Sequence, residues 1–183
     1  MNITVTSSQT KEPEPWLRGT LADVPAVIRA VLHALELAHE DAERWCADMT
    51  GIEVNARPSG LPSVAFQLRH IAGSVDRLLT YAEGRDLSEA QLAELRREGD
   101  GAMPHVLLRE FGVSIARASQ RIREFVGADL EAARVVGRKR LPTTLGGLLV
   151  HVAEHTQRHA GQMVTTAKVV KATRDLATSR EPR

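Results

Sequence analysis

The sequence contains a single cysteine, Cys46, and few aromatic residues, which make up 3% of its 183 residues. One cysteine excludes an intrachain disulfide framework and any cluster of thiolate metal ligands. The N-terminus also lacks the basic start and the apolar run that are typical of a secretion signal. A reducing compartment fits these absences, and we expect a cytoplasmic protein.

No charge of one sign dominates, because the formal net charge is +1. A balance this close to neutral provides no global field that would attract nucleic acid or anionic lipid. The short basic run Arg138-Lys139-Arg140 has no aromatic residues interleaved with it, which argues against a nucleic-acid site. No apolar run approaches the length needed to span a bilayer. We therefore expect no nucleic-acid or membrane partner, and a small molecule as substrate.

The composition, 43% apolar and 26% charged, fits one compact domain with a sizeable core. The first residues are polar and include Pro13 and Pro15, so residues 1–15 are predicted to form a flexible arm. The domain is expected over residues 16–171. The polar residues 172–183 are expected to be a frayed tail.

Apolar residues recur every three or four positions in four long stretches, which predicts four amphipathic helices. A shorter helix is predicted from Ser88 to Arg97, because Ser88 and Gln91 have the spacing of a capping box. Strict alternation of apolar and polar residues, the sign of a strand, is absent. The pattern predicts an all-α four-helix bundle with one short accessory helix, its long helices running over Asp23–Met49, Val64–Glu83, Pro104–Phe125 and Thr144–Val170.

The segments between these helices are expected to be loops. Residues 51–62 contain two glycines and two prolines, and residues 129–143 contain Gly137 and Pro142. We therefore expect an irregular connection in each place. Ser63 is placed to cap the second long helix, and Thr143 or Thr144 to cap the last.

The last helix carries three histidines, His151, His155 and His159, at intervals of four residues. On an α-helix this spacing keeps them on one face, with neighbouring Cα atoms roughly 6 Å apart. Two such imidazoles are able to bind one metal ion, but a tight site needs a further ligand. His70 lies between the apolar residues Leu68 and Ile71 of the second helix. Taken alone, His70 is more typical of a hydrogen-bonded core residue than of a metal ligand. The pair His155 and His159 is as typical of a solvated helix face as of a metal site.

Two segments together resemble a known family. They are Ser-Val-Ala-Phe-Gln-Leu-Arg-His at residues 63–70, and Leu-Leu-Val-His-Val-Ala-Glu-His-Thr-Gln-Arg-His-Ala-Gly-Gln at residues 148–162. They are similar to the DinB/YfiT-like superfamily of metal-binding four-helix bundles, and the resemblance covers about residues 16–170. It implies that His70, His155 and His159 bind a divalent metal ion. His151 is not part of the usual triad, and we assign it to the outer site or to packing.

Three neutral imidazoles would leave such an ion its full charge and at least one open coordination position. Zinc, nickel and other first-row metals all accept histidine nitrogens. Gln162 lies seven residues after His155 and returns to the same helix face, where it would contact ligand or substrate, or serve packing. Glu154 is about 100° from His155 around the helix, which favours surface charge or an outer contact. Gly161 is interpreted as a point of close helix contact.

A second motif overlaps the histidine column. Residues 151–155, His-Val-Ala-Glu-His, match the inverted zinc-peptidase signature H-x-x-E-H, in which the glutamate acts as general base. That mechanism needs a further ligand downstream. After His159 the available carboxylates are Asp175 and Glu181, both near the end predicted to fray, which argues against a peptidase.

The family resemblance implies a metal-dependent S-transferase that uses a low-molecular-weight thiol such as bacillithiol, mycothiol or glutathione as co-substrate. The metal would hold the thiol as a thiolate and thereby lower its pKa. Two alternatives stay open: a non-catalytic metal-binding or interaction bundle, and a metal-dependent hydrolase that needs no thiol. Cys46 has no neighbouring cation that would activate it, so we interpret it as buried or inert. The resemblance also makes a homodimer the expected assembly.

Overall fold

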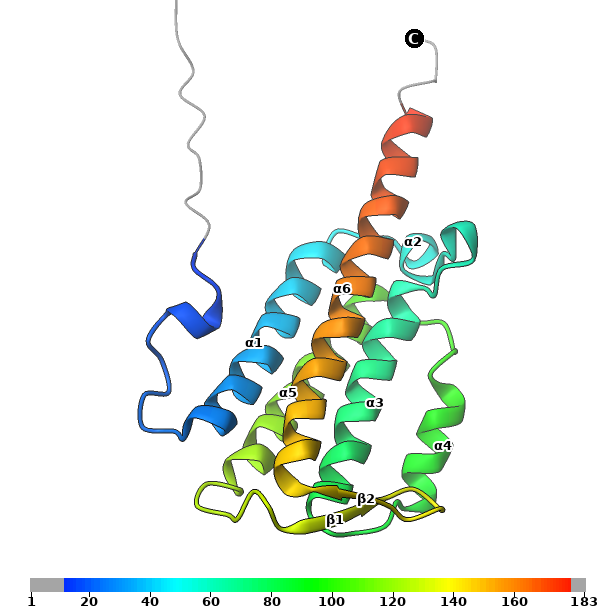
Figure 1. Ribbon diagram of the computed structural model, residues 1–183. Coiled ribbons are helices and arrows are strands. Elements are labelled where there is room, and N and C mark those ends of the chain that lie inside the picture. The colour runs from blue at the N-terminus through cyan, green and yellow to red at the C-terminus, as the bar shows by residue number, and fades with distance from the viewer. Residues whose placement is uncertain (1–11, 179–183) are drawn as a thin grey trace, which may run out of the picture.

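The computed structural model describes residues 12–178. In this part of the chain four long helices lie side by side (Figure 1). Each of them packs against two of the others. The prediction of a mainly helical protein is confirmed, and the four helices are α1 (Ala26–Cys46), α3 (Val64–Ala82), α5 (Pro104–Arg123) and α6 (Leu145–Thr178).

The apolar stripes of these helices meet in one core. Its largest fully buried side chains come from all four long helices, so each of these four contributes to it. Burying a side chain of this size contributes about 1.5 to 3 kcal/mol relative to leaving it in water. Representative members are Leu35, Leu68, Ile71, Phe111 and Leu149.

Side-chain caps fix where several helices begin. The hydroxyl of Ser63 accepts a hydrogen bond from the amide of Phe66, as expected for the cap of α3. The helix α4 (Glu89–Arg97) opens with the predicted Ser88 capping box. Thr144 caps α6 by accepting a bond from the amide of Gly147. Helix α1 begins only after Pro25 and has no side-chain cap, so the first helix starts later than predicted.

The segment predicted as a loop over residues 51–62 contains a short helix, α2 (Gly51–Asn55). Thr50 and Glu53 form a reciprocal capping box that starts it. The three-residue spacing of Thr50 and Glu53 is typical of a helix start, but the glycines and prolines of this segment favoured a loop. Two short 3-10 helices also occur, η1 (Pro15–Leu17) and η2 (Pro58–Gly60).

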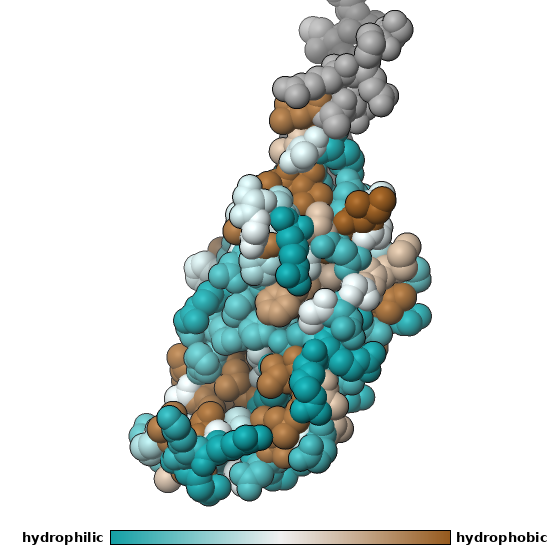
Figure 2. Space-filling model, turned by 90° about the vertical axis from the view of Figure 1, so that its right-hand side faces the viewer, coloured by the Kyte–Doolittle hydropathy of each residue, from teal (hydrophilic) through white to brown (hydrophobic). Residues whose placement is uncertain are grey.

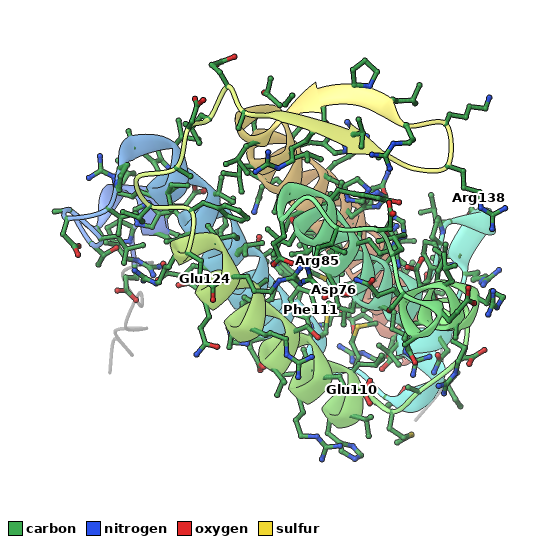
Figure 3. The ribbon with its side chains drawn as sticks, turned by 90° about the horizontal axis from the view of Figure 1, so that it is seen from below. Asp76, Arg85, Glu110, Phe111, Glu124 and Arg138 are labelled. Carbon is green, nitrogen blue, oxygen red and sulfur yellow. The ribbon has the colours of Figure 1, made fainter. Side chains whose placement is uncertain are left out.

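A small sheet corrects the all-α prediction. Strands β1 (Ala133–Val136) and β2 (Leu141–Thr144) pair antiparallel within the segment expected to be irregular. β-Branched residues in both strands favour the extended backbone. Gly137 adopts a φ of 69° and thereby lets the chain reverse between the strands. The basic run forms this turn, and Arg138 lies at its tip (Figure 3).

Helix α6 is 34 residues long, about 50 Å, and extends past the other helices (Figure 1). Residues 172–178 are therefore helical, and α6 ends at Thr178 rather than at the predicted Val170. Lys171 forms an ion pair with Asp48, and the ammonium of Lys168 lies 4.5 Å from the Trp45 ring centroid. These contacts tie the middle of α6 to the end of α1. The predicted arm is described only from residue 12, so residues 1–11 and 179–183 lie outside the described part.

Helix α4 lies beside α3 at the edge of the molecule (Figure 1). The side that carries it shows hydrophilic side chains interspersed with separate hydrophobic patches (Figure 2). Among the described residues, none of the helices combines the length and the apolar character that crossing a membrane requires.

Candidate metal centre

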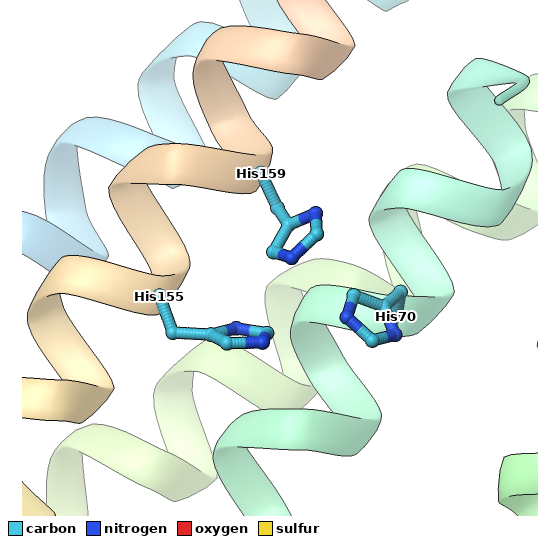
Figure 4. Close-up of side chains that lie close together, drawn as sticks. All are labelled: His70, His155 and His159. Carbon is cyan, nitrogen blue, oxygen red and sulfur yellow. The ribbon is translucent and has the colours of Figure 1, made fainter. Parts of the chain in front are cut away.

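The three histidines predicted to bind metal come from two adjacent helices. His70 projects from α3, and His155 and His159 project from successive turns of α6, so that the three rings point toward one another (Figure 4). One potential ligand atom from each lies within 4.8 Å of the others. Each histidine is half-buried, so solvent still reaches the cluster.

His70 is oriented by a buried carboxylate. Its Nδ1 lies 2.8 Å from Oε2 of Glu98, which follows directly after α4 and is 6% exposed. Burial raises the pKa of Glu98, but the bonds from His70 and Arg77 outweigh it and hold the pKa below its usual value. An ionised carboxylate only accepts hydrogen bonds, so Nδ1 of His70 carries the proton. The lone pair of its Nε2 is thereby available to a metal.

His159 is oriented by an amide. Its Nδ1 donates to Oε1 of Gln67 at 2.9 Å, and Nε2 of Gln67 donates in turn to Oε1 of Gln162 at 3.2 Å. Gln67 is fully buried. This chain again leaves Nε2 of the histidine free to bind. Gln162 contacts Gln67 and also hydrogen-bonds the His159 side chain, so it lies directly beside the cluster.

His155 has the strongest electrostatic perturbation of the three. Burial, with the neighbouring His159 and His70, lowers its pKa to about 4. Burial and His70 also lower the pKa of His159. Both imidazoles are therefore neutral at pH 7, as metal ligands must be. Nδ1 of His155 is buried and has no hydrogen-bond partner in the described part of the chain. An uncompensated buried nitrogen beside two convergent imidazoles fits a site built for a cation.

The sequence profile of the DinB superfamily matches residues 34–163, a range that includes all three histidines. The chain belongs to the DinB superfamily. Its fold is similar to the crystal structure of a conserved protein from Enterococcus faecalis, with a TM-score of 0.58 and 20% sequence identity. That likeness covers 80% of this chain and 98% of the other chain, and it concerns the fold alone. No curated protein matches the sequence.

The remaining candidates of this DinB protein lie at the outer side of the cluster. The ring of His151 meets that of His155 edge-on, with 5.5 Å between centroids. Glu154 is exposed and accepts bonds from His151 and Arg158. The peptidase interpretation fails on distance, because Asp175 lies twenty residues beyond His155 on the same helix, about 30 Å along its axis. Glu181 lies outside the described residues.

Two supporting residues of this DinB site, Glu98 and Gln67, were not assigned a role from sequence. Gln67 gave a signal, because a glutamine at an apolar position of an amphipathic helix needs hydrogen-bond partners. Glu98 gave none, since its contact with His70 depends on how the connection between α3 and α4 folds. Phe66 completes the surroundings by stacking on His70, with 5.4 Å between ring centroids.

Proposed function

We propose that this protein is a divalent-metal-dependent S-transferase that uses a low-molecular-weight thiol. His70, His155 and His159 hold one ion, and the four long helices form the DinB-type four-helix bundle that positions them. The observation that carries the proposal is the convergence of three imidazoles, two of them with lowered pKa values, at a place that solvent reaches. Three protein ligands and an open side are typical of a catalytic rather than a structural metal site.

The ion, when bound, supplies a positive charge that lowers the pKa of a thiol at the open position. The chain supplies the rigid ligand set. Glu98 fixes the proton of His70 on Nδ1, and Gln67 does the same for His159. In the transfer, the thiol sulfur bonds to an electrophilic substrate atom, whose leaving group departs with the bonding electron pair. The thiol proton is released to solvent.

Metal content tests the ligand assignment. Protein purified without chelator or nickel affinity should hold about one first-row metal ion per chain, and His70→Ala, His155→Ala and His159→Ala should each lose most of it. His151→Ala is the matched control, because it removes an imidazole from the same column outside the triad, and it should keep the ion. Full metal content in the His155 variant would refute the assignment.

Cobalt substitution tests the open position. The visible spectrum of a Co²⁺-loaded site should change in a saturable way when a low-molecular-weight thiol is added. A site with no response to thiol, whose metal removal mainly lowers the melting temperature, would instead identify a structural ion that links α3 to α6. Turnover of an activated ester without any thiol would favour metal-dependent hydrolysis. Absence of metal under every loading condition would exclude all three metal functions.

A further inference from the structure

A cavity of about 540 Å³ lies between α3, α4 and α5. This volume is within the range of small-molecule sites. Leu68, Ala72 and Asp76 line it from successive turns of α3, whereas none of the three metal-site histidines is among its described lining residues. It lies beside the metal centre and shares with it Arg77 and Glu98, which support His70. Figure 3, viewed from below, shows Asp76 and Phe111 between α3 and α5.

Both ends of α4 are attached to α3, but its side chains do not fill the space between α4 and α5, and this space is the cavity. Near its start, Nε2 of Gln91 donates to Asp76 at 2.6 Å and to Thr80 at 2.8 Å. After its last turn, Glu98 accepts a bond from Arg77 at 2.8 Å. No residue of α4 is buried, so its side chains leave open the space between it and α5.

The floor of the cavity is apolar. Phe111 and Leu107 of α5 and Leu68 of α3 lie beneath it and are each only 1% exposed, so the apolar surface that a ligand would meet is that of Ala72 and Ala90 and of the alkyl parts of the other lining side chains. The three buried residues belong to the core, so the floor is rigid. An aromatic or branched apolar group of a ligand would be removed from water on this surface.

The walls carry five arginines. Those with N–H groups that bind no other residue determine which charge a ligand should carry. Arg121 and Arg77 are occupied, since they pair with Asp76 and Glu98 respectively. Arg117 has no ion pair or hydrogen bond within the described part of the chain. Arg69 donates to the backbone oxygen of Asp100, which uses one of the five N–H groups of its guanidinium. The N–H groups that remain free to bind a ligand are therefore hydrogen-bond donors of positively charged side chains.

The carboxylates that line the same cavity offer less. Asp76 and Glu98 each accept bonds from two side chains, and Glu94 pairs with Arg97 at 3.5 Å. Glu110 has no ion pair in the described residues and is exposed at the edge of α5 (Figure 3), as Arg117 is, but it is one carboxylate against two arginines, Arg117 and Arg69, that keep unused donors. The interior therefore favours an acceptor on the ligand.

We propose that this cavity binds a small amphipathic anion. An apolar, ring-sized body lies against Ala72 and Ala90, above the buried Phe111, and a carboxylate accepts hydrogen bonds from Arg117 and Arg69. Paired N–H groups of a guanidinium match the geometry of a carboxylate. The site includes none of the three metal-site histidines and does not depend on the proposed transferase activity.

The probe is 4-phenylbutyrate, and its neutral amide, 4-phenylbutyramide, is the matched control ligand. Titration of the full chain, followed by NMR of the arginine side-chain N–H groups, should give saturable shifts at Arg117 and Arg69. The amide should bind at least about tenfold more weakly, as should the acid to Arg117→Gln, because each change removes a charge-assisted hydrogen bond. Arg123→Gln, an equal change at an exposed position of α5 outside the cavity, should bind the acid as wild type does.

Metal-free and metal-loaded protein should bind the acid equally, which separates this site from a carboxylate held by the metal ion. Ala72→Leu, which fills the cavity, should abolish binding of acid and amide alike. Equal affinity for acid and amide in the unsubstituted protein would overturn the proposal whatever the stability of the variants. Unchanged affinity in Arg117→Gln, or no saturable shift at the arginines at millimolar probe, would also overturn it.

Discussion

Glu98 and His70 are 28 positions apart in the sequence, yet a 2.8 Å hydrogen bond joins them. This bond makes the short helix α4 part of the support of the metal centre. Glu98→Gln keeps the size of the side chain but removes its charge, and the new amide is able to donate as well as accept. The His70 tautomer is then no longer fixed. Loss of such an outer partner typically costs 10- to 100-fold in metal affinity, and we expect a loss in that range.

Competition with a chromophoric chelator measures this loss directly. The matched control is Glu94→Gln, which makes the same change at an exposed position of the same helix. Equal zinc affinity in the two variants would show that Glu98 has no role in positioning His70.

Gly73→Ala tests the support of His70 by Glu98 in a second way, by placing a methyl group next to the Arg77–Glu98 pair. A Cβ atom at residue 73 would lie 2.8 Å from Nη1 of Arg77 and 2.9 Å from Oε1 of Glu98. Both are ends of flexible side chains, so the helix tolerates the methyl group but the Arg77–Glu98 pair must shift. We expect metal affinity to fall severalfold. The unfolding free energy should change little, because alanine in a helix gains about 1 kcal/mol over glycine and offsets part of the lost pairing.

Gly161→Ala is the control for that experiment. Apart from its own helix backbone, no atom of residues 12–178 lies within 4 Å of a Cβ atom at residue 161, so the close helix contact expected there is wrong. The substitution should raise the unfolding free energy by up to about 1 kcal/mol and leave metal affinity unchanged. Urea unfolding and the same chelator titration measure both quantities. A matching fall in metal affinity would mean that Gly73→Ala acts through general helix effects.

The sequence predicted the long helices but not the hairpin. The apolar periodicity of α3 and α5 predicted the first and last residues of both helices to within about two positions. Each helix is amphipathic, and Ser63 and Pro104 are local signals of where they begin. The hairpin was missed because its strands are only four residues each. Its pairing joins positions such as Ala133 and Thr144. A period-two pattern over four residues is too short to detect.

The candidate site divides in the same way. His155 and His159 are one helix turn apart, so local geometry alone places them together. Placing His70 beside them required the family resemblance, because helix packing is a tertiary property. The polar partner of His70 lies after an accessory helix whose position no local pattern specifies. The donor-rich cavity beneath α4 was also unpredictable, since it depends on which arginines are already paired.

The lowered pKa of His155 predicts how acid affects the metal-free protein. Its value is about 4 in the folded state and near 6.5 when unfolded. Between these pH values the unfolded chain binds more protons, so stability falls as pH drops from about 6.5 to about 4, with no further loss from this group below that. The full shift corresponds to about 3 kcal/mol, and partial exposure of the ring reduces the expected loss to about 1 to 2 kcal/mol.

Urea unfolding of metal-free protein at several pH values between 7 and 4 tests this expectation. His155→Asn should show a shallower decline than wild type, because asparagine does not titrate. His105→Asn, at an exposed position of α5, controls for the loss of an imidazole as such. Parallel curves for wild type and His155→Asn would contradict the assigned pKa shift.

Experiments on Cys46 test whether the reacting thiol is an external small molecule or the protein's own cysteine. The side chain is fully buried, its Sγ lies 3.3 Å from Sδ of Met163, and burial raises its pKa to about 12. At pH 7 it is a protonated thiol without access to substrate. Native protein should therefore not react with a disulfide reagent until urea unfolds it. Cys46→Ala should keep its metal and any thiol-transfer activity, at a cost of about 1 kcal/mol in stability. Loss of transfer with full metal content would instead make Cys46 the nucleophile and remove the need for an external thiol.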